Sequence, residues 1–237
     1  MFRKIIFIFL TMIIAVKYAH AAGAGIFATV GSGSQSIDFN VKINDSNSIG
    51  HSSVDGIYLL VNFGIFYEIS GLFGMSDNNF LGISAGYQKI QDDEITANIS
   101  DWMYDFNNRL TAYEYMIPVT IYYKYKINEK FAMKGGLGFT YISLDWKRKT
   151  RVYSNSSNTV SNITNTVSES KIMPHIDTGV EWIFSRFVTL GGELSYGFNG
   201  VISSDYANPI YTEKYKRDFS GLVVKVILKF YVVRGSN

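Results

Sequence analysis

The chain has 237 residues, with 17 Tyr, 17 Phe and 21 Gly but only three Pro and no Cys. This balance suits β-strands better than disorder or a collagen-like structure, and the absence of Cys excludes disulfides and thiolate metal sites. The formal charge of +2 gives no strong basic field, so a nucleic-acid partner is not expected.

Residues 1–21 have the three parts of a cleavable signal peptide. "MFRK" carries two positive charges, "IIFIFLTMIIAV" is an apolar stretch, and "AHA" at 19–21 fits the small-x-small cleavage pattern. An uncleaved anchor would need about 20 apolar residues, and this stretch ends at Lys17. We therefore expect export, with residues 22–237 as the mature domain and a formal charge of −1.

Eight later segments alternate apolar and polar residues, which is the period of two that a strand produces. In chain order they are 22–33, 56–69, 80–88, 114–127, 130–142, 175–184, 188–199 and 220–233. In the last of them, Leu222, Val224 and Val226 share one face, whereas Lys225 and Lys229 lie on the other. The first segment has the weakest pattern because it has few bulky residues.

A sheet with one apolar and one polar face fits either a soluble sandwich or a membrane barrel. The connections favour a barrel, which has short periplasmic turns and long outer loops. Those near 128–130 and 185–187 are short, whereas 44–54, 91–109, 147–171 and 201–216 are long and polar. The sequence therefore predicts an all-β fold, a closed antiparallel up-and-down transmembrane β-barrel of eight strands in the bacterial outer membrane.

Aromatic residues gather near the short turns, where a membrane interface favours amphipathic rings. The predicted girdle consists of Tyr67, Tyr123, Tyr125, Phe131, Trp182, Phe184 and Tyr231.

Charged residues fall on the polar faces, which a membrane barrel turns inward. A cation at the lipid midplane costs about 2–4 kcal/mol, so Lys225 and Lys229 are expected in the lumen. The predicted lumenal charge network consists of Glu68, Glu114, Lys124, Lys126, Lys134, His175, Asp177, Glu181, Glu193, Lys225 and Lys229. Side chains can fill a barrel of about eight strands, so these charges predict a largely plugged interior.

On these features the chain resembles the small eight-stranded outer-membrane β-barrels, the OmpA/OmpX-type and opacity-like surface proteins. The resemblance rests on the leader, on "YMIPVTIYYKYKINEKFAMKGGLGFTYI", and on "GLVVKVILKFY", which looks like the assembly-recognition strand of such barrels. Two departures are "VVRGSN" after Tyr231, where these barrels usually end on an aromatic residue, and Pro118, which removes a ladder donor and suggests a bulge.

One polar set has the composition of a catalytic site. If 184–186 is a three-residue hairpin loop, His175 lies opposite Ser195 with Asp177 on the same face, which resembles a Ser-His-acid set. Polar inward residues are expected on every strand, however, and no nucleophile motif surrounds Ser195 in "GGELSYGFNG". We therefore expect no enzyme activity. His51 has no second ligand nearby, so neither a metal nor another cofactor is expected.

Basic residues at the ends of two outer loops form a possible anion-binding rim. They are Lys147, Arg148, Lys149, Arg151, Lys214, Lys216 and Arg217. They could bind lipopolysaccharide phosphates or an acidic host glycan, or form only a solvated rim among anionic headgroups. We predict a monomeric structural or surface-interaction barrel whose partners are outer-membrane lipid, lipopolysaccharide and a possible host ligand. The alternatives are a narrow pore for small solutes and, less favoured, a lipid A-modifying enzyme.

Overall fold

The computed structural model describes residues 22–44, 49–70, 78–90, 93–100, 104–154, 157, 159–207 and 209–234. The expected signal peptide, 1–21, lies outside these residues. The strands are β1 (Ala22–Ile43), β2 (Ile49–Ser70), β3 (Asn79–Ile90), β4 (Asp93–Ser100), β5 (Tyr104–Lys126), β6 (Phe131–Ser154), β7 (Thr159–Ile183), β8 (Val188–Gly197), β9 (Val201–Ala207), β10 (Tyr211–Asp218) and β11 (Gly221–Arg234). No helix in the described ranges is long and apolar enough to cross a membrane.

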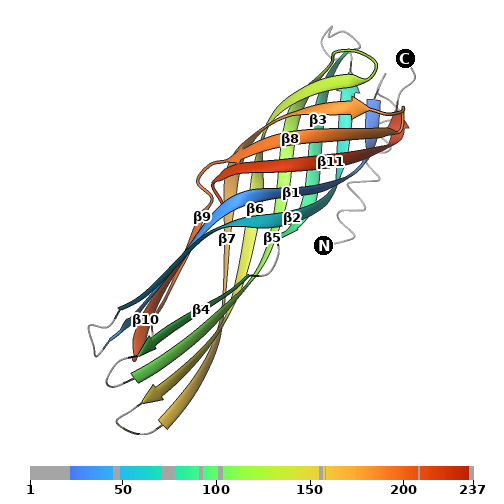
Figure 1. Ribbon diagram of the computed structural model, residues 1–237. Coiled ribbons are helices and arrows are strands. Elements are labelled where there is room, and N and C mark those ends of the chain that lie inside the picture. The colour runs from blue at the N-terminus through green and yellow to red at the C-terminus, as the bar shows by residue number, and fades with distance from the viewer. Residues whose placement is uncertain are drawn as a thin grey trace.

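The strands form one antiparallel sheet that closes on itself (Figure 1). Around the ring the order is β1, β2, β3, β5, β6, β7, β8 and β11, and β11 pairs with β1. β4 continues β3 alongside β5, while β9 and β10 form a hairpin that continues β8 and β11. The 11 segments thus make eight up-and-down strands, as predicted. The weakly patterned segment that starts at Ala22 is the strand that closes the ring.

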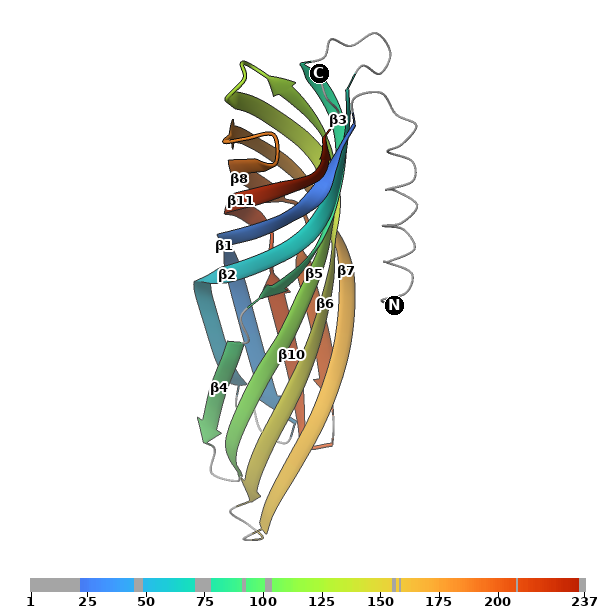
Figure 2. The ribbon, with the colours of Figure 1, turned by 90° about the vertical axis from the view of Figure 1, so that its right-hand side faces the viewer.

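The wall continues beyond one end of the ring as two four-stranded sheets. One consists of β4, β5, β6 and β7, and the other of β9, β10, β1 and β2. β8 pairs with β7 as far as Gly197, opposite His175, and the chain then turns away so that β9 pairs with β10. Figure 2 shows both sheets projecting from the same end of the barrel. We call the described residues within 36–55, 93–113, 143–171 and 201–218 the outer extension.

The prediction of long polar outer loops is wrong. The ranges 44–54, 91–109, 147–171 and 201–216 are mostly strand, and the connections at this end are reduced to 44–48, 101–103, 155–158 and 208–210. Even the low-complexity stretch 154–170 belongs largely to β7.

Loops were predicted here because, partway along each long strand, the apolar side chains move from the outward face to the inward face. Val30 in β1 and Leu137 in β6 are apolar, outward and exposed. Further along the same strands, Phe39 and Trp146 are apolar, inward and buried, while their neighbours on the outward face are polar. The alternation with a period of two continues, but the apolar residues now lie on the inward face. A prediction that follows only outward apolar residues therefore ends each strand too early.

An apolar core lies between the two sheets of the outer extension and continues into the adjoining end of the barrel. It consists of Ile37, Phe39, Val41, Ile43, Tyr58, Leu60, Ile90, Leu110, Ala112, Met116, Ile142, Leu144, Trp146, Val152, Met173, Ile202, Tyr211, Tyr215, Phe219 and Val223. Trp146 of one sheet packs edge-on against Tyr215 of the other, with ring centroids 3.6 Å apart. The extension is therefore a packed layer above the barrel, comparable to a small β-sandwich.

Both predicted short turns are present at the opposite end of the barrel. In the first, the Asn128 side-chain oxygen accepts hydrogen bonds from the backbone N–H groups of Lys130 and Phe131, at 2.8 and 2.9 Å. In the second, the Phe184 N–H donates to the Val188 carbonyl, so the loop is 185–187. This loop begins one residue later than the 184–186 loop on which the His175–Ser195 juxtaposition depended.

Candidate functional site

An apolar belt surrounds the outside of the ring. Its exposed residues include Ile57, Leu59, Val61, Phe63, Ile121, Leu137, Phe139, Ile176, Val180, Leu194, Leu222, Val224, Val226 and Phe230. A continuous exposed apolar surface of this kind is unfavourable in water, and a closed barrel satisfies all its backbone hydrogen bonds without water. The protein is a transmembrane β-barrel. This is the architecture of single-chain bacterial outer-membrane proteins, which places the chain in that membrane.

The aromatic girdle is present at the short-turn end of the belt. Phe131 and Trp182 are half exposed and stacked, with ring centroids 6.3 Å apart, and Trp182 lies 4.4 Å from Phe184. Tyr231 was wrongly assigned to this girdle. It lies on the lysine face of β11, it is buried, and its hydroxyl donates to Glu68 at 3.0 Å.

The lower lumen, next to the short turns, holds four charges in a closed square. Glu68 of β2 and Glu181 of β7 alternate with Lys124 of β5 and Lys229 of β11. Lys124 pairs with Glu68 and lies 3.6 Å from Glu181, while Lys229 pairs with Glu181 and lies 3.3 Å from Glu68. The Tyr122 hydroxyl also donates to Glu68, at 2.8 Å. Each carboxylate therefore contacts both ammonium groups across the lumen.

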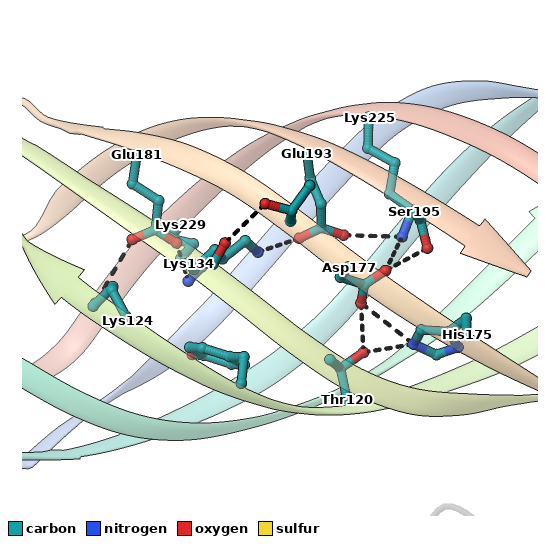
Figure 3. Close-up of polar contacts among 12 residues, drawn as sticks. Thr120, Lys124, Lys134, His175, Asp177, Glu181, Glu193, Ser195, Lys225 and Lys229 are labelled. Carbon is teal, nitrogen blue, oxygen red and sulfur yellow. Dashed lines mark hydrogen bonds and ion pairs between the residues drawn. The ribbon is translucent and has the colours of Figure 1, made fainter.

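A second cluster of charges lies higher in the lumen (Figure 3). Lys134 pairs with Glu193, and the Lys225 ammonium lies 2.9 Å from Glu193 and 3.8 Å from Asp177. Figure 3 shows these side chains, from β6, β7, β8 and β11, directed toward one another across the interior.

These two clusters contain equal numbers of opposite charges. We use the name lumenal charge network for these four lysines and four carboxylates: Glu68, Lys124, Lys134, Asp177, Glu181, Glu193, Lys225 and Lys229. None of the eight side chains is more than 13% exposed, so each charge depends on its partners rather than on bulk water.

His175 and Ser195 lie on opposite sides of Asp177. Because the hairpin loop is 185–187, Asp177 pairs in register with Ser195, and His175 pairs with Gly197. The Ser195 hydroxyl donates to one Asp177 oxygen, and His175 Nε2 lies 3.3 Å from the other. A Ser-His-acid relay requires the histidine between the serine and the acid. The predicted juxtaposition of His175 with Ser195 is therefore corrected.

Threonines fix the orientation of His175. Thr120 Oγ1 lies 2.9 Å from Nε2, Thr140 Oγ1 lies 3.1 Å from Nδ1, and Thr120 also donates to Asp177 at 3.0 Å. Gly138 leaves room for the ring, since a Cβ at that position would lie 2.6 Å from Nε2. These threonines were not predicted, although each lies on the same face and strand as a predicted charge.

A cavity of about 40 Å³ lies beside the higher cluster. Thr120, Tyr122, Lys134, Asp177, Glu193 and Lys225 are among its lining residues. This volume has room for a few water molecules, and the polar lining offers them partners. No cluster of three or more His, Cys, Asp or Glu side chains that could hold a metal ion occurs in the part of the chain that the structure describes.

Two further ion pairs are buried above the network, where the lumen meets the apolar core. Arg217 of β10 contacts Glu114 of β5 and also donates to Gln35, and Arg148 of β6 contacts Glu213 of β10. These side chains are almost fully buried, and both pairs join one sheet of the extension to the other. Arg148 and Arg217 are therefore not part of an outer rim, which corrects their predicted position.

The remaining predicted residues have the following positions. Glu114 belongs to the upper pair rather than to the lumenal charge network, and Lys126 is half-buried at the end of β5, outside that network. Lys147, Lys149 and Arg151 are exposed on the outer face of β6, as are Lys214 and Lys216 on β10. His51 is exposed, with Nδ1 2.6 Å from the side-chain oxygen of Asn40.

Comparison with known proteins found neither a matching family model nor a matching curated protein. Among solved structures, the chain is similar to the outer membrane protein OprG from Pseudomonas aeruginosa, at 12% identity and TM-score 0.42, covering 90% of this chain and 97% of that one. It is also similar to Ail, the attachment invasion locus protein of Yersinia pestis, at 11% identity and TM-score 0.31, covering 89% and 99%. At these values the likeness concerns the fold alone.

The prediction that the chain has no enzyme activity is withdrawn. The outer membrane protease OmpT from Escherichia coli is also similar in structure, at 8% identity and TM-score 0.30, with 87% of this chain and 96% of that one covered. Barrels of this kind thus include an enzyme, and a fold by itself does not exclude activity.

Proposed function

We propose that this protein is a monomeric surface-interaction barrel, close in plan to the OmpA/OmpX-type and opacity-like proteins, with a plugged interior. Its belt is embedded in outer-membrane lipid and lipopolysaccharide, and its outer extension presents a folded surface to the exterior. The observation that carries the proposal is the succession of closed layers along the barrel axis.

The first closed layer is the lumenal charge network. Its lysines and carboxylates reach across the interior from six of the eight strands of the ring, namely β2, β5, β6, β7, β8 and β11. A hydrated ion entering the lumen would have to displace contacts between buried, mutually paired charges. Leaving one of these charges without its partner costs about 3–5 kcal/mol, which opposes permeation.

The second closed layer is the apolar core of the outer extension. Large side chains such as Trp146, Phe39 and Tyr215 are buried between its two sheets. A dry apolar layer has no groups that could replace the hydration of an ion or polar solute. The two layers oppose conduction by different physical means, so the loss of one would leave the other.

The second candidate function is a narrow pore for small solutes. The cavity of about 40 Å³ beside the higher cluster favours it, because water in that cavity could connect with further openings of the network. A solute-sized path would require the charge network and the apolar core to open together.

Conductance in planar lipid bilayers tests the proposal. The full-length mature protein should insert, as judged by its heat-modifiable migration on a denaturing gel, and the bilayer should stay silent. A porin in the same membrane serves as a positive control. Reproducible stepwise currents from the folded, unmodified barrel would refute the plugged interior and support the pore.

A further inference from the structure

Five of the exposed basic residues of the outer extension fall into two groups with different surroundings. Lys214 and Lys216 are on β10, in one sheet, and Lys147, Lys149 and Arg151 are on β6, in the other. Cross-strand neighbours on one face of an antiparallel pair lie about 4.5–5.5 Å apart, so the register determines which charges are compensated.

The lysines of β10 have acidic neighbours in register. Lys216 lies opposite Asp38 of β1, and Lys214 lies opposite Asp205 of β9. Opposite charges in directly paired positions stabilise a sheet. This basic group is therefore part of a balanced charged surface, which has little excess attraction for an anion.

The basic residues of β6 have no acidic neighbour in register within the described strands. Their partners on β5 and β7 are Thr111 and Thr166 for Lys147, Arg109 and Thr164 for Lys149, and Asn107 and Asn162 for Arg151. The nearest carboxylates on this face are Asp145, two residues before Lys147 on β6, and Asp105 of β5, which is diagonal to Arg151. We call Arg109, Lys147, Lys149 and Arg151 the basic stripe.

Two cations of the basic stripe face each other directly. Arg109 is exposed and lies in register with Lys149. Arg109 therefore adds a fourth exposed cation to this face of the sheet. Arg109 was absent from the predicted rim because it is isolated in the sequence, and only the register brings it beside β6.

The basic stripe lies beyond the lipid headgroups. Tyr141 is the last aromatic residue on the outward face of β6 before the stripe, and Lys147 and Arg151 are six and ten residues further along the strand. At about 3.3 Å per residue these positions are about 20 and 33 Å from Tyr141 along the strand. Even with a tilt of about 45° this exceeds the headgroup layer of about 5–8 Å.

The neighbours of the basic stripe are hydroxyl and amide side chains. No aromatic or aliphatic residue occurs among the six partners of Lys147, Lys149 and Arg151. Protein interfaces concentrate their binding energy in buried aromatic anchors, whereas the aromatic residues of this face, Tyr113 and Tyr153, flank the stripe rather than lie within it. Threonine and asparagine side chains can instead form hydrogen bonds with sugar hydroxyls, while the cations attract sulfate or phosphate groups.

We propose that the basic stripe binds an extended anionic polysaccharide, one that carries sulfate or phosphate groups, in the space outside the membrane. The inference rests on the proposed function, because the extension must face the exterior.

Binding to immobilised heparin, a sulfated polysaccharide, tests the inference. The mature protein is reconstituted in nanodiscs of neutral lipid, and affinity is measured at several salt concentrations, with uncharged dextran as the blank. The test variant is Lys147→Gln/Lys149→Gln/Arg151→Gln. The matched control, Lys42→Gln/Lys214→Gln/Lys216→Gln, removes the same number of exposed charges from the other sheet.

The test variant should bind heparin about tenfold more weakly than the unmodified protein. Its slope of log Kd against log salt should fall by about 2–3, because each lost cation displaces about one counterion fewer. The control should stay within about twofold. Equal weakening in both variants would mean that only net charge matters, and would overturn the inference.

Two further outcomes separate the possible failures. A barrel that is heat-modifiable and silent but does not bind heparin refutes the polysaccharide site and leaves the proposed function intact. If lipopolysaccharide vesicles compete as well as heparin at equal charge, the stripe recognises headgroup phosphates and the assignment to an extended polysaccharide is wrong.

Discussion

The substitution Glu68→Gln gives the sharpest test of the lumenal charge network. Glu68 receives hydrogen bonds from Tyr122 and Tyr231 at 2.8 and 3.0 Å, pairs with Lys124 and lies 3.3 Å from Lys229. Glutamine has nearly the same shape, so packing is retained. What changes is that two lysines must then share the single carboxylate of Glu181.

The expected destabilisation follows from the burial of this site. The Glu68 and Lys124 side chains are 2% and 3% exposed, so water cannot compensate the missing charge. Removing one partner of such a buried pair costs about 3–5 kcal/mol in unfolding free energy. Glu129→Gln, in an exposed turn, is the matched control and should change stability by less than about 0.5 kcal/mol.

A double-mutant cycle separates charge balance from packing. Adding Lys124→Met to Glu68→Gln restores equal charge, because Lys229 and Glu181 remain paired. The double variant should recover at least about 2 kcal/mol relative to Glu68→Gln alone. Urea unfolding in phospholipid vesicles, followed by tryptophan fluorescence and gel mobility, gives both values. The reasoning is refuted if Glu68→Gln costs less than about 1 kcal/mol, or if the second substitution adds to the loss.

Three other outcomes are expected. Val226→Arg places a cation on the lipid face of β11 and should destabilise the inserted barrel by about 2–4 kcal/mol. Its control, Ser203→Arg on the exposed face of β9, should be nearly neutral in the same urea assay. Equal effects would contradict the assignment of the belt. Trp146→Ala removes the largest side chain of the extension core and should destabilise that layer by about 3–5 kcal/mol. The expected result is faster proteolysis of the extension, while the barrel keeps its heat-modifiable migration. If protease resistance and heat-modifiable migration are lost together, the two parts fold as one unit. Burial raises the pKa of Tyr211 in the extension from 10.0 to about 12. The contribution of this shift to stability is therefore present below pH 10 and is lost as the pH rises toward 12. Tyr211→Phe should abolish that part of the alkaline loss of stability, measured by urea unfolding at pH 9 and pH 11.5.

The barrel itself was predictable because its strands obey one simple rule. Period-two alternation put Lys225 and Lys229 on the face opposite Leu222, and the structure has them on the inside. The partners of each lysine were not predictable. Glu68 and Lys229 are 161 residues apart in the chain, and the stagger of the strands around the ring decides which side chains share a height.

The catalytic resemblance failed because of one residue in one turn. Moving the loop from 184–186 to 185–187 shifts the opposing strand by two positions, so Asp177 rather than His175 faces Ser195. Both alignments keep the same residues inside, so the hydrophobic pattern cannot distinguish them. The Ser185 hydroxyl, which accepts hydrogen bonds from the N–H groups of Phe187 and Val188, was the local feature that could have fixed the loop.

The outer extension, by contrast, was visible in the sequence. Arg148 follows Trp146 by two residues and Arg217 follows Tyr215 by two, so each arginine shares a face with a buried aromatic residue. Because these ranges were predicted to be loops, the shared face of each arginine and its aromatic neighbour was overlooked. Continuing the alternation with reversed polarity would have predicted the strands, the core and the burial of both arginines.

The reversal has a physical cause in the solvent outside the wall. A strand that is apolar on both faces is a continuous hydrophobic run with a strong tendency to aggregate. Where the outward face meets lipid, the inward face is largely glycine, threonine and paired charge, with Phe27, Phe66, Ile227 and Tyr231 among the exceptions. Where the outward face meets water, the inward face is free to be apolar. The medium outside thus sets the chemistry inside at each height, which is why charge pairs fill the membrane section of this barrel and a hydrophobic core fills the section above it.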